Sequence, residues 1–192
     1  MRGARYYPEV KIMKILIASD IHGSANYCRQ LMSAYERESA EKLVLLGDLL
    51  YHGPRNDLPY EYDPKKVIEM LNAKKDEIIC VRGNCDADVD TVVMKFPLVP
   101  EYAAIFIEDR TIYITHGHEF NEDFPMPMKK GDIMIHGHTH VPQCDILDNF
   151  ICMNPGSVSL PRNDSPHSYM TYEDKVFLWK DLRGEVYKEY KL

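Results

Sequence analysis

Short apolar runs recur along the first half of the chain and are separated by segments with helical spacing of apolar residues. The apolar runs have the length of buried strands and lie at residues 14–18, 43–46 and 78–81. Between the first two, Ser24 is a suitable N-cap for a helix over about 25–37. Asp63-Pro64 resembles an N-cap followed by proline at the first helical position. This strand–helix–strand–helix–strand order predicts a parallel sheet.

The second half contains many strand signals and few helix signals. Residues 102–108 and 111–115 flank Asp109-Arg110 and predict a hairpin. Further candidate strands lie at 133–135, 149–153, 169–172, 175–179 and 186–190. We therefore expect two packed sheets with helices outside the first, rather than two domains. Residues 1–12 are expected to be an extension outside a single domain that spans 13–192.

Five of the apolar runs end in side chains that bind metals well. The seven candidate ligands are Asp20, His22, Asp48, Asn84, His116, His138 and His140. Parallel strands present such side chains together at the carboxyl edge of their sheet. Carboxylate, imidazole and amide donors suit two hard or borderline divalent cations, not an iron–sulfur cluster. The pattern therefore predicts a two-metal phosphoester hydrolase.

Composition restricts the class of protein further. The chain has 192 residues, of which 45% are hydrophobic and 28% charged, as in ordinary globular domains. Its formal net charge of -7 makes a nonspecific nucleic-acid partner unlikely. Five cysteines without a CxxC pair indicate a reducing cytoplasm. No apolar run approaches the roughly 20 residues that cross a bilayer, so we expect no membrane segment.

The ligand-bearing segments resemble those of the calcineurin-like metallophosphoesterases. The family motifs appear here as DIH, GDLL, GNCD, THGH and GHTH, and the resemblance covers residues 14 to about 160. Within that family, the chain is similar to the small YfcE-like bacterial phosphodiesterases in SDIHGS, LLGDLLYHGPRN and NPGSVSLPR. The resemblance implies an α/β fold, a four-layer αββα sandwich of two packed mixed sheets. It also implies a dimetal centre, commonly with manganese, although the ligands also accept Fe, Zn or Ni.

The same resemblance implies a role for each ligand. Asp20, His22, Asp48 and His140 would hold the first metal, whereas Asn84, His116 and His138 would complete the second. Asp48 would bridge the two ions. A hydroxide between the metals would then attack the phosphorus of a small phosphodiester, and Asn84 would also touch the phosphoryl group.

One position departs from the broad family pattern. The histidine that normally follows the asparagine of GNH is taken as the acid that protonates the leaving group, and here this position is Cys85. A thiol is a weak hydrogen-bond donor with an ordinary pKa of about 8.5. Cys85 is therefore either a poor acid or a residue that fills space, and His52 and His118 are the other candidate proton donors. We expect esters with poor leaving groups to react slowly.

Residues 51–63 follow Asp48 directly and include two candidate substrate contacts, His52 and Arg55. An arginine can pair with two phosphate oxygens at once, but an ordinary surface loop would have the same composition. The segment 154–162 contains an Asn-Pro-Gly turn signal, which we interpret as backbone geometry behind the metal site.

Other functions fit the same pattern. A phosphomonoesterase or a nucleotide pyrophosphatase would use the same ligands. A non-catalytic scaffold, like the retromer subunit that shares this fold, would have an incomplete ligand set, whereas all seven positions are filled here. A nuclease is disfavoured by the acidic balance and by the lack of a basic, aromatic-rich stripe. The family resemblance also suggests a homo-oligomer.

Overall fold

The computed structural model describes residues 13–98, 100–107 and 109–192, so the predicted extension at 1–12 lies outside the described residues. Its elements are β1 (Ile15–Ala18), α1 (Ala25–Glu38), β2 (Lys42–Leu45), α2 (Pro64–Asn72), β3 (Ile78–Cys80), α3 (Asp90–Val93), β4 (Tyr102–Ile107), β5 (Arg110–Thr115), β6 (Asp132–Ile135), β7 (Gln143–Ile146), β8 (Phe150–Asn154), β9 (Ser168–Glu173), β10 (Val176–Asp181) and β11 (Val186–Lys191). In this part of the chain, no helix combines the length and apolar character that a membrane span requires.

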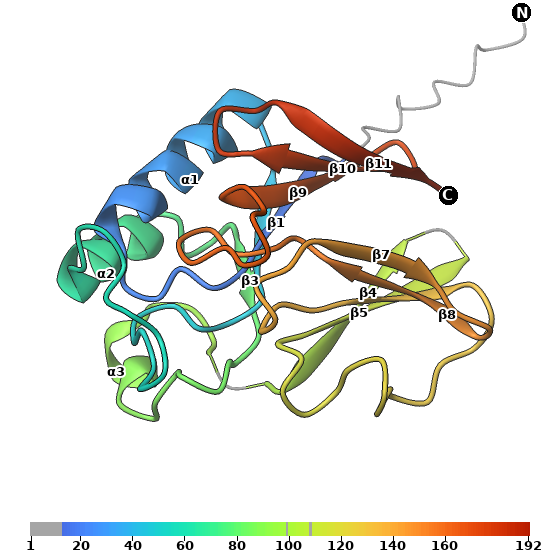
Figure 1. Cartoon of the computed structure of the whole chain (residues 1–192), viewed down its shortest axis with the longest axis horizontal. Coiled ribbons are helices and arrows are strands. Elements are labelled where there is room, and N and C mark those ends of the chain that lie inside the picture. Colours follow the sequence, from blue (N-terminus) through green and yellow to red (C-terminus); the bar gives the residue numbers. More distant parts are fainter. Residues whose placement is uncertain (1–12, 99, 108) are drawn as a thin grey trace, which may run out of the picture.

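The strands form two mixed sheets that pack face to face (Figure 1). The first has the order β11-β10-β9-β1-β2-β3 and the second the order β4-β5-β6-β8-β7. Strands β1, β2 and β3 pair in parallel, as the sequence predicted. Strand β9 then adds to the other side of β1 in the antiparallel direction.

Strand β1 is buried on both faces because it lies between the helices and the second sheet. Leu16 and Ala18 pack toward α1 and α2, whereas Ile15 and Ile17 belong to the core between the sheets. Such a strand reads as a continuous apolar run rather than as an alternating one. Both helices begin at the predicted caps, because the Ser24 side chain accepts from the Tyr27 N–H and the Asp63 side chain accepts from the Lys66 N–H.

The outer face of the second sheet is covered by the segment 117–131. Met126 from this segment packs against Met134 of β6 and against Phe150 and Cys152 of β8. The helices α1 and α2 lie over the first sheet (Figure 1). The structure thus confirms the two packed mixed sheets. In the expected αββα sandwich the fourth layer would be helical, whereas in the described part of the chain the loop 117–131 covers this face of the second sheet.

Candidate metal centre

The seven predicted ligands come together at the carboxyl ends of strands from both sheets. Each follows a strand whose burial holds the backbone in place, and the loops after β1, β2, β3, β5 and β6 supply them. Gly47 and Gly83 let two of these loops approach, because a Cβ on Gly47 would lie 2.4 Å from the Gly83 nitrogen. The carboxylate of Asp48 and the amide of Asn84 therefore reach the same side of the sheet edge.

Distances between donor atoms divide the ligands into two overlapping groups. In the first, the His140 Nε2 atom lies 3.3 Å from Asp20 Oδ1 and 3.2 Å from His22 Nε2. In the second, the His116 Nε2 atom lies 3.0 Å from Asn84 Oδ1 and 3.3 Å from His138 Nδ1.

Asp48 lies between these groups. Its Oδ2 atom is 3.4 Å from His116 Nε2 and 3.7 Å from His22 Nε2. The arrangement agrees with the predicted bridging role of Asp48.

Backbone carbonyls determine which ring nitrogen of three histidines faces the centre. The Nδ1 atoms of His22, His116 and His140 lie 2.6–2.8 Å from the carbonyl oxygens of Tyr51, Leu46 and Leu160, respectively. In the neutral rings Nδ1–H donates to each carbonyl, and Nε2 then presents its lone pair to the centre. The Nε2 atoms of His22 and His140 lie 3.2 Å apart, and a proton or a cation between them offsets the repulsion of two lone pairs.

Five of the seven ligands have a left-handed backbone conformation. Their φ values are 59° at Asp20, 49° at His22, 54° at Asp48, 66° at His138 and 62° at His140. This region is uncommon for residues other than glycine, although aspartate and histidine enter it more often than most. Strain of this kind concentrates at functional sites, where the surrounding structure holds it.

Two groups of hydrogen bonds support the ligand loops from behind the centre. The Asp86 carboxylate accepts hydrogen bonds from the backbone N–H groups of Asp48, Leu49 and Gly83, each at 2.8 Å. From the segment 154–162, the hydroxyls of Ser157 and Ser159 both donate to the Asp20 carbonyl. The second observation agrees with the interpretation of that segment as backbone support.

The charges of the centre also suit cations. Burial alone would raise the pKa of the Asp20 carboxyl, but His140 and His22 hold it well below its usual range. Burial opposes protonation of His116, yet the Asp48 carboxylate raises the pKa of His116 to about 9. Burial would raise the pKa of the Asp48 carboxyl, but His116 lowers it, so both carboxylates are ionised inside the protein. Asp20 Oδ1 is buried without a hydrogen-bond partner. The donor set fits divalent metal ions on these grounds.

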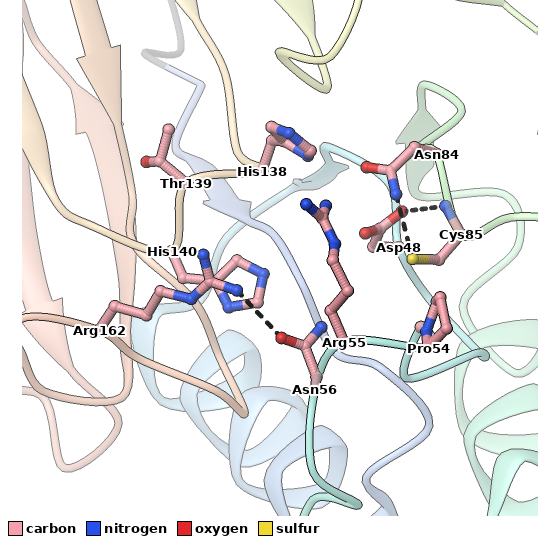
Figure 2. A pocket seen from close by; sticks show the side chains of 11 residues that line it. Asp48, Pro54, Arg55, Asn56, Asn84, Cys85, His138, Thr139, His140 and Arg162 are labelled. Atoms are coloured by element: carbon pink, nitrogen blue, oxygen red, sulfur yellow. Dashed lines mark hydrogen bonds between the residues drawn. The ribbon is translucent and has the colours of Figure 1, made fainter.

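A pocket of about 280 Å³ opens in front of this centre. Its lining residues are Asp48, Gly53, Pro54, Arg55, Asn56, Asn84, Cys85, His138, Thr139, His140 and Arg162. Figure 2 shows Arg55 extending toward Asn84 and His138, while Arg162 approaches from the side of His140. The Arg162 guanidinium donates to Asn56 Oδ1 at 3.0 Å and so connects two loops across the rim.

Neither Arg162 nor Asn56 was predicted as a site residue. Arg162 is the last residue of NPGSVSLPR, a motif that carries the family resemblance. A positively charged residue at the end of that motif could have indicated a phosphate contact.

The three candidate proton donors occupy different places. Cys85 lines the pocket, and burial followed by the Asp48 carboxylate raises the pKa of its thiol to about 12. His52 packs edge-on against Tyr51 and Tyr62 instead of lining the pocket. The role of His52 as a substrate contact stays a prediction.

His118 is likewise not among the residues that line the pocket. Its ring centroid is 5.4 Å from that of His116, and its Nε2 atom is 3.8 Å from a carboxylate oxygen of Glu101. Burial, followed by the neighbouring His116, lowers the pKa of His118. His118 as the proton donor stays a prediction.

Comparisons with known proteins give the same family. A family model described as the calcineurin-like phosphoesterase superfamily domain matches residues 13–175. Phosphodiesterase YfcE of Escherichia coli strain K12 is 39% identical over 165 residues, which cover 86% of this chain and 90% of that protein. Phosphodiesterase MJ0936 of Methanocaldococcus jannaschii is 28% identical over 152 residues, covering 75% and 83%, respectively.

A solved structure of the Escherichia coli phosphoesterase YfcE superposes with a TM-score of 0.90 at 36% identity, covering 93% of this chain and 99% of that one. The loops that carry the predicted ligands fall within the residues matched by the family model. On the family match and on the identity to YfcE, the chain belongs to the calcineurin-like phosphoesterase superfamily.

Proposed function

We propose that this protein is a phosphodiesterase that binds two divalent cations at the shared edge of its sheets. The observation that carries the proposal is the convergence of the predicted donors, with the Nε2 atoms of His22 and His140 only 3.2 Å apart. The unpartnered buried Asp20 Oδ1 supports it. Phosphodiesters are the proposed substrate class because relatives at 39% and 28% identity are phosphodiesterases.

The residues assigned to each cation follow the two groups of donor distances. Asp20, His22, Asp48 and His140 would hold one ion, whereas Asp48, Asn84, His116 and His138 would hold the other. When bound, such ions supply Lewis acidity toward phosphoryl oxygens and lower the pKa of water. Manganese is our proposed native metal, and the protein's location is proposed to be the cytoplasm.

The chain's own residues would orient the substrate and provide the proton for the leaving group. Arg55 and Arg162 enter the pocket from different loops and would bind the phosphoryl oxygens and the second ester substituent. Cys85 is the candidate donor that lines the pocket, and a thiol with so high a pKa is a weak acid. The proposed enzyme therefore favours esters whose leaving groups need little protonation.

Two alternatives are tested together with this proposal. A phosphomonoesterase or nucleotide pyrophosphatase would act at the same centre but prefer a different ester. A binding scaffold would hold metals without turnover.

The decisive experiment titrates metal-free protein with Mn²⁺ while following hydrolysis of a p-nitrophenyl phosphodiester and of the corresponding monoester. We expect faster turnover of the diester, which is lost on chelation. Asp48→Asn should lose roughly 100-fold or more in kcat, because one substitution disturbs both sets of ligands. Asp57→Asn, on the exposed part of the loop after β2, is the matched control.

The outcomes separate the alternatives. Faster turnover of the monoester would replace the proposal with a phosphomonoesterase. Metal binding without turnover of either ester would favour the scaffold. An Asp48→Asn variant with the metal content and rate of the original protein would refute the bridging assignment.

A further inference from the structure

A second group of metal-binding side chains lies on the outer face of the second sheet, outside the ligand set described above. Donor atoms of Glu122, His136 and Cys152 all lie within 4.8 Å of one another. His136 follows β6, Cys152 lies in β8 and Glu122 belongs to the covering segment 117–131. His136 and Cys152 are buried, so two of the three donors are held by the sheet itself.

One amide side chain connects these donors to a fourth. The Gln143 Nε2 group donates to the Glu122 carboxylate and, at 2.8 Å, to Asp145 Oδ2. Asp145 pairs with Cys152 in the β7–β8 register, so both side chains are on the same face of the sheet. No ion pair joins either carboxylate to a lysine or arginine of the described residues. Two anions thus share one neutral amide.

The ring of His136 has an oxygen acceptor beside each nitrogen, and the Asn154 amide nitrogen also lies 3.4 Å from Nδ1. Its Nδ1 atom lies 3.0 Å from the Gly137 carbonyl oxygen, and its Nε2 atom lies 3.2 Å from Gln143 Oε1. A neutral imidazole has one N–H and can donate to only one of these oxygens. A cation at Nε2 would leave Nδ1–H for the carbonyl, which is the arrangement of His22, His116 and His140 in the first centre.

We propose that Cys152, His136, Glu122 and Asp145 form a zinc site that is separate from the catalytic centre. Thiolate, imidazole and carboxylate are each zinc ligands, and four of them can complete a tetrahedral site, whereas the soft sulfur disfavours manganese. Binding releases the Cys152 thiol proton to water. Zinc binding also requires the Gln143 side chain to move away from the donor atoms. Gln143 has room to move because it lies on β7, an edge strand that is partly exposed to solvent.

The position of this site gives zinc a structural role. Through Glu122 it ties the covering segment 117–131 to the sheet. Through His136 it reaches the Gly137 carbonyl, which also accepts from Asn154 Nδ2 at 2.8 Å. Gly137 immediately precedes His138, so the zinc site braces the loop that carries two predicted catalytic ligands.

Cobalt substitution tests the site independently of activity. We expect metal-free protein to bind a third equivalent of Co²⁺ and to develop a thiolate-to-cobalt charge-transfer absorption. The experiment uses a Cys85→Ala background, because the Cys85 sulfur lies beside His22 and Asp48. In that background Cys152→Ala should lose both the absorption and the third equivalent. Cys144→Ala, on the opposite face of the neighbouring strand, should keep them.

Glu122→Gln provides a second variant that leaves the core intact, because Glu122 is exposed. It should weaken cobalt binding at this site about tenfold, as loss of a ligand or its support typically does. Absence of the thiolate absorption at saturating Co²⁺, or its persistence in Cys152→Ala, would overturn the proposal. Failure of the phosphodiesterase proposal would instead show as absent turnover with this absorption unchanged.

Discussion

Asp86 is not a predicted ligand, yet its carboxylate accepts three backbone N–H groups from the loops that carry Asp48 and Asn84. Burial, opposed by these hydrogen bonds, raises the pKa of Asp86. Its role was difficult to predict because an aspartate in a loop is usually a turn residue. In addition, two of its three hydrogen-bond partners, Leu49 and Asp48, lie 37 and 38 positions away in the sequence.

We predict that Asp86→Asn weakens metal binding by roughly 10–100-fold, as loss of a group that orients ligands usually does. The asparagine side chain has only one acceptor oxygen for the three backbone N–H groups. Its NH₂ group would face one of these N–H groups, and two donors cannot form a hydrogen bond with each other. Calorimetric titration of metal-free protein with Mn²⁺ measures the affinity. Asp88→Asn is the matched control, since the Asp88 side chain is 93% exposed. Equal affinities in the two variants would contradict the role given to Asp86.

The residue types alone predicted the donor set of the metal centre. Strand-end aspartates and histidines are few, and the structure brings all seven predicted ligands together. The pocket wall was harder to predict, because Arg55, Asn56 and Arg162 meet only after two distant loops have folded. His52 was assigned to the pocket by its distance from Asp48 along the chain, but its ring packs against tyrosines instead.

At the scale of elements, Glu38 joins α1 to the first sheet. Its carboxylate lies 2.8 Å from Lys180 Nζ of β10, 2.9 Å from Lys14 Nζ and 2.8 Å from the Tyr169 hydroxyl of β9. Burial opposes ionisation, but these partners lower the pKa of Glu38 from 4.5 to about 2. The helix end is thus held to strands that are far away in the sequence.

We expect the stabilisation from Glu38 to be complete above pH 4.5 and to be lost as the pH falls toward 2. The reason is that the carboxyl binds a proton more weakly in the folded chain than in the unfolded chain. Glu38→Gln should lower the free energy of unfolding at pH 7 by about 2–3 kcal/mol and reduce its decline in acid. Urea denaturation between pH 2.5 and 7 with chelator present measures both effects. Exposed Glu36→Gln serves as control, and an identical pH profile in both variants would exclude Glu38 as the cause.

The elements with continuous apolar runs were predicted well, whereas two others were missed. β7 reads QCDI, half polar and exposed at the sheet edge, so its residues carry no burial pattern. α3 has only four residues, too few for a helical periodicity. The antiparallel addition of β9 to β1 joins segments about 150 residues apart, and local patterns contain no information about such pairing.

At the scale of the whole molecule, the two sheets share one interface, and Trp179 lies in it. This single tryptophan is fully buried, and its indole N–H donates to the Asn154 carbonyl oxygen of the second sheet at 2.7 Å. The indole therefore reports on the contact between the sheets, while circular dichroism reports on their strands and on the helices.

We predict that tryptophan emission and circular dichroism follow one coincident urea transition, as for a single domain over residues 13–192. Trp179→Ala should cost about 3–5 kcal/mol, because it leaves a large cavity between the sheets. Phe106→Ala, at a side chain that is 79% exposed, should change stability by less than about 0.5 kcal/mol. Two separate transitions would divide the chain into independently folding parts.

The left-handed backbone at five predicted ligands has a consequence for protein engineering. Glycine adopts this conformation freely, whereas aspartate and histidine pay for it, with a cost of order 1–3 kcal/mol at such positions. A library selected only for heat resistance, without metal, would therefore enrich glycine at Asp20, His22, Asp48, His138 and His140. The most thermostable variants in such a library would be those that had lost catalysis. Selection of this fold for thermostability therefore has to include a screen for turnover at every round.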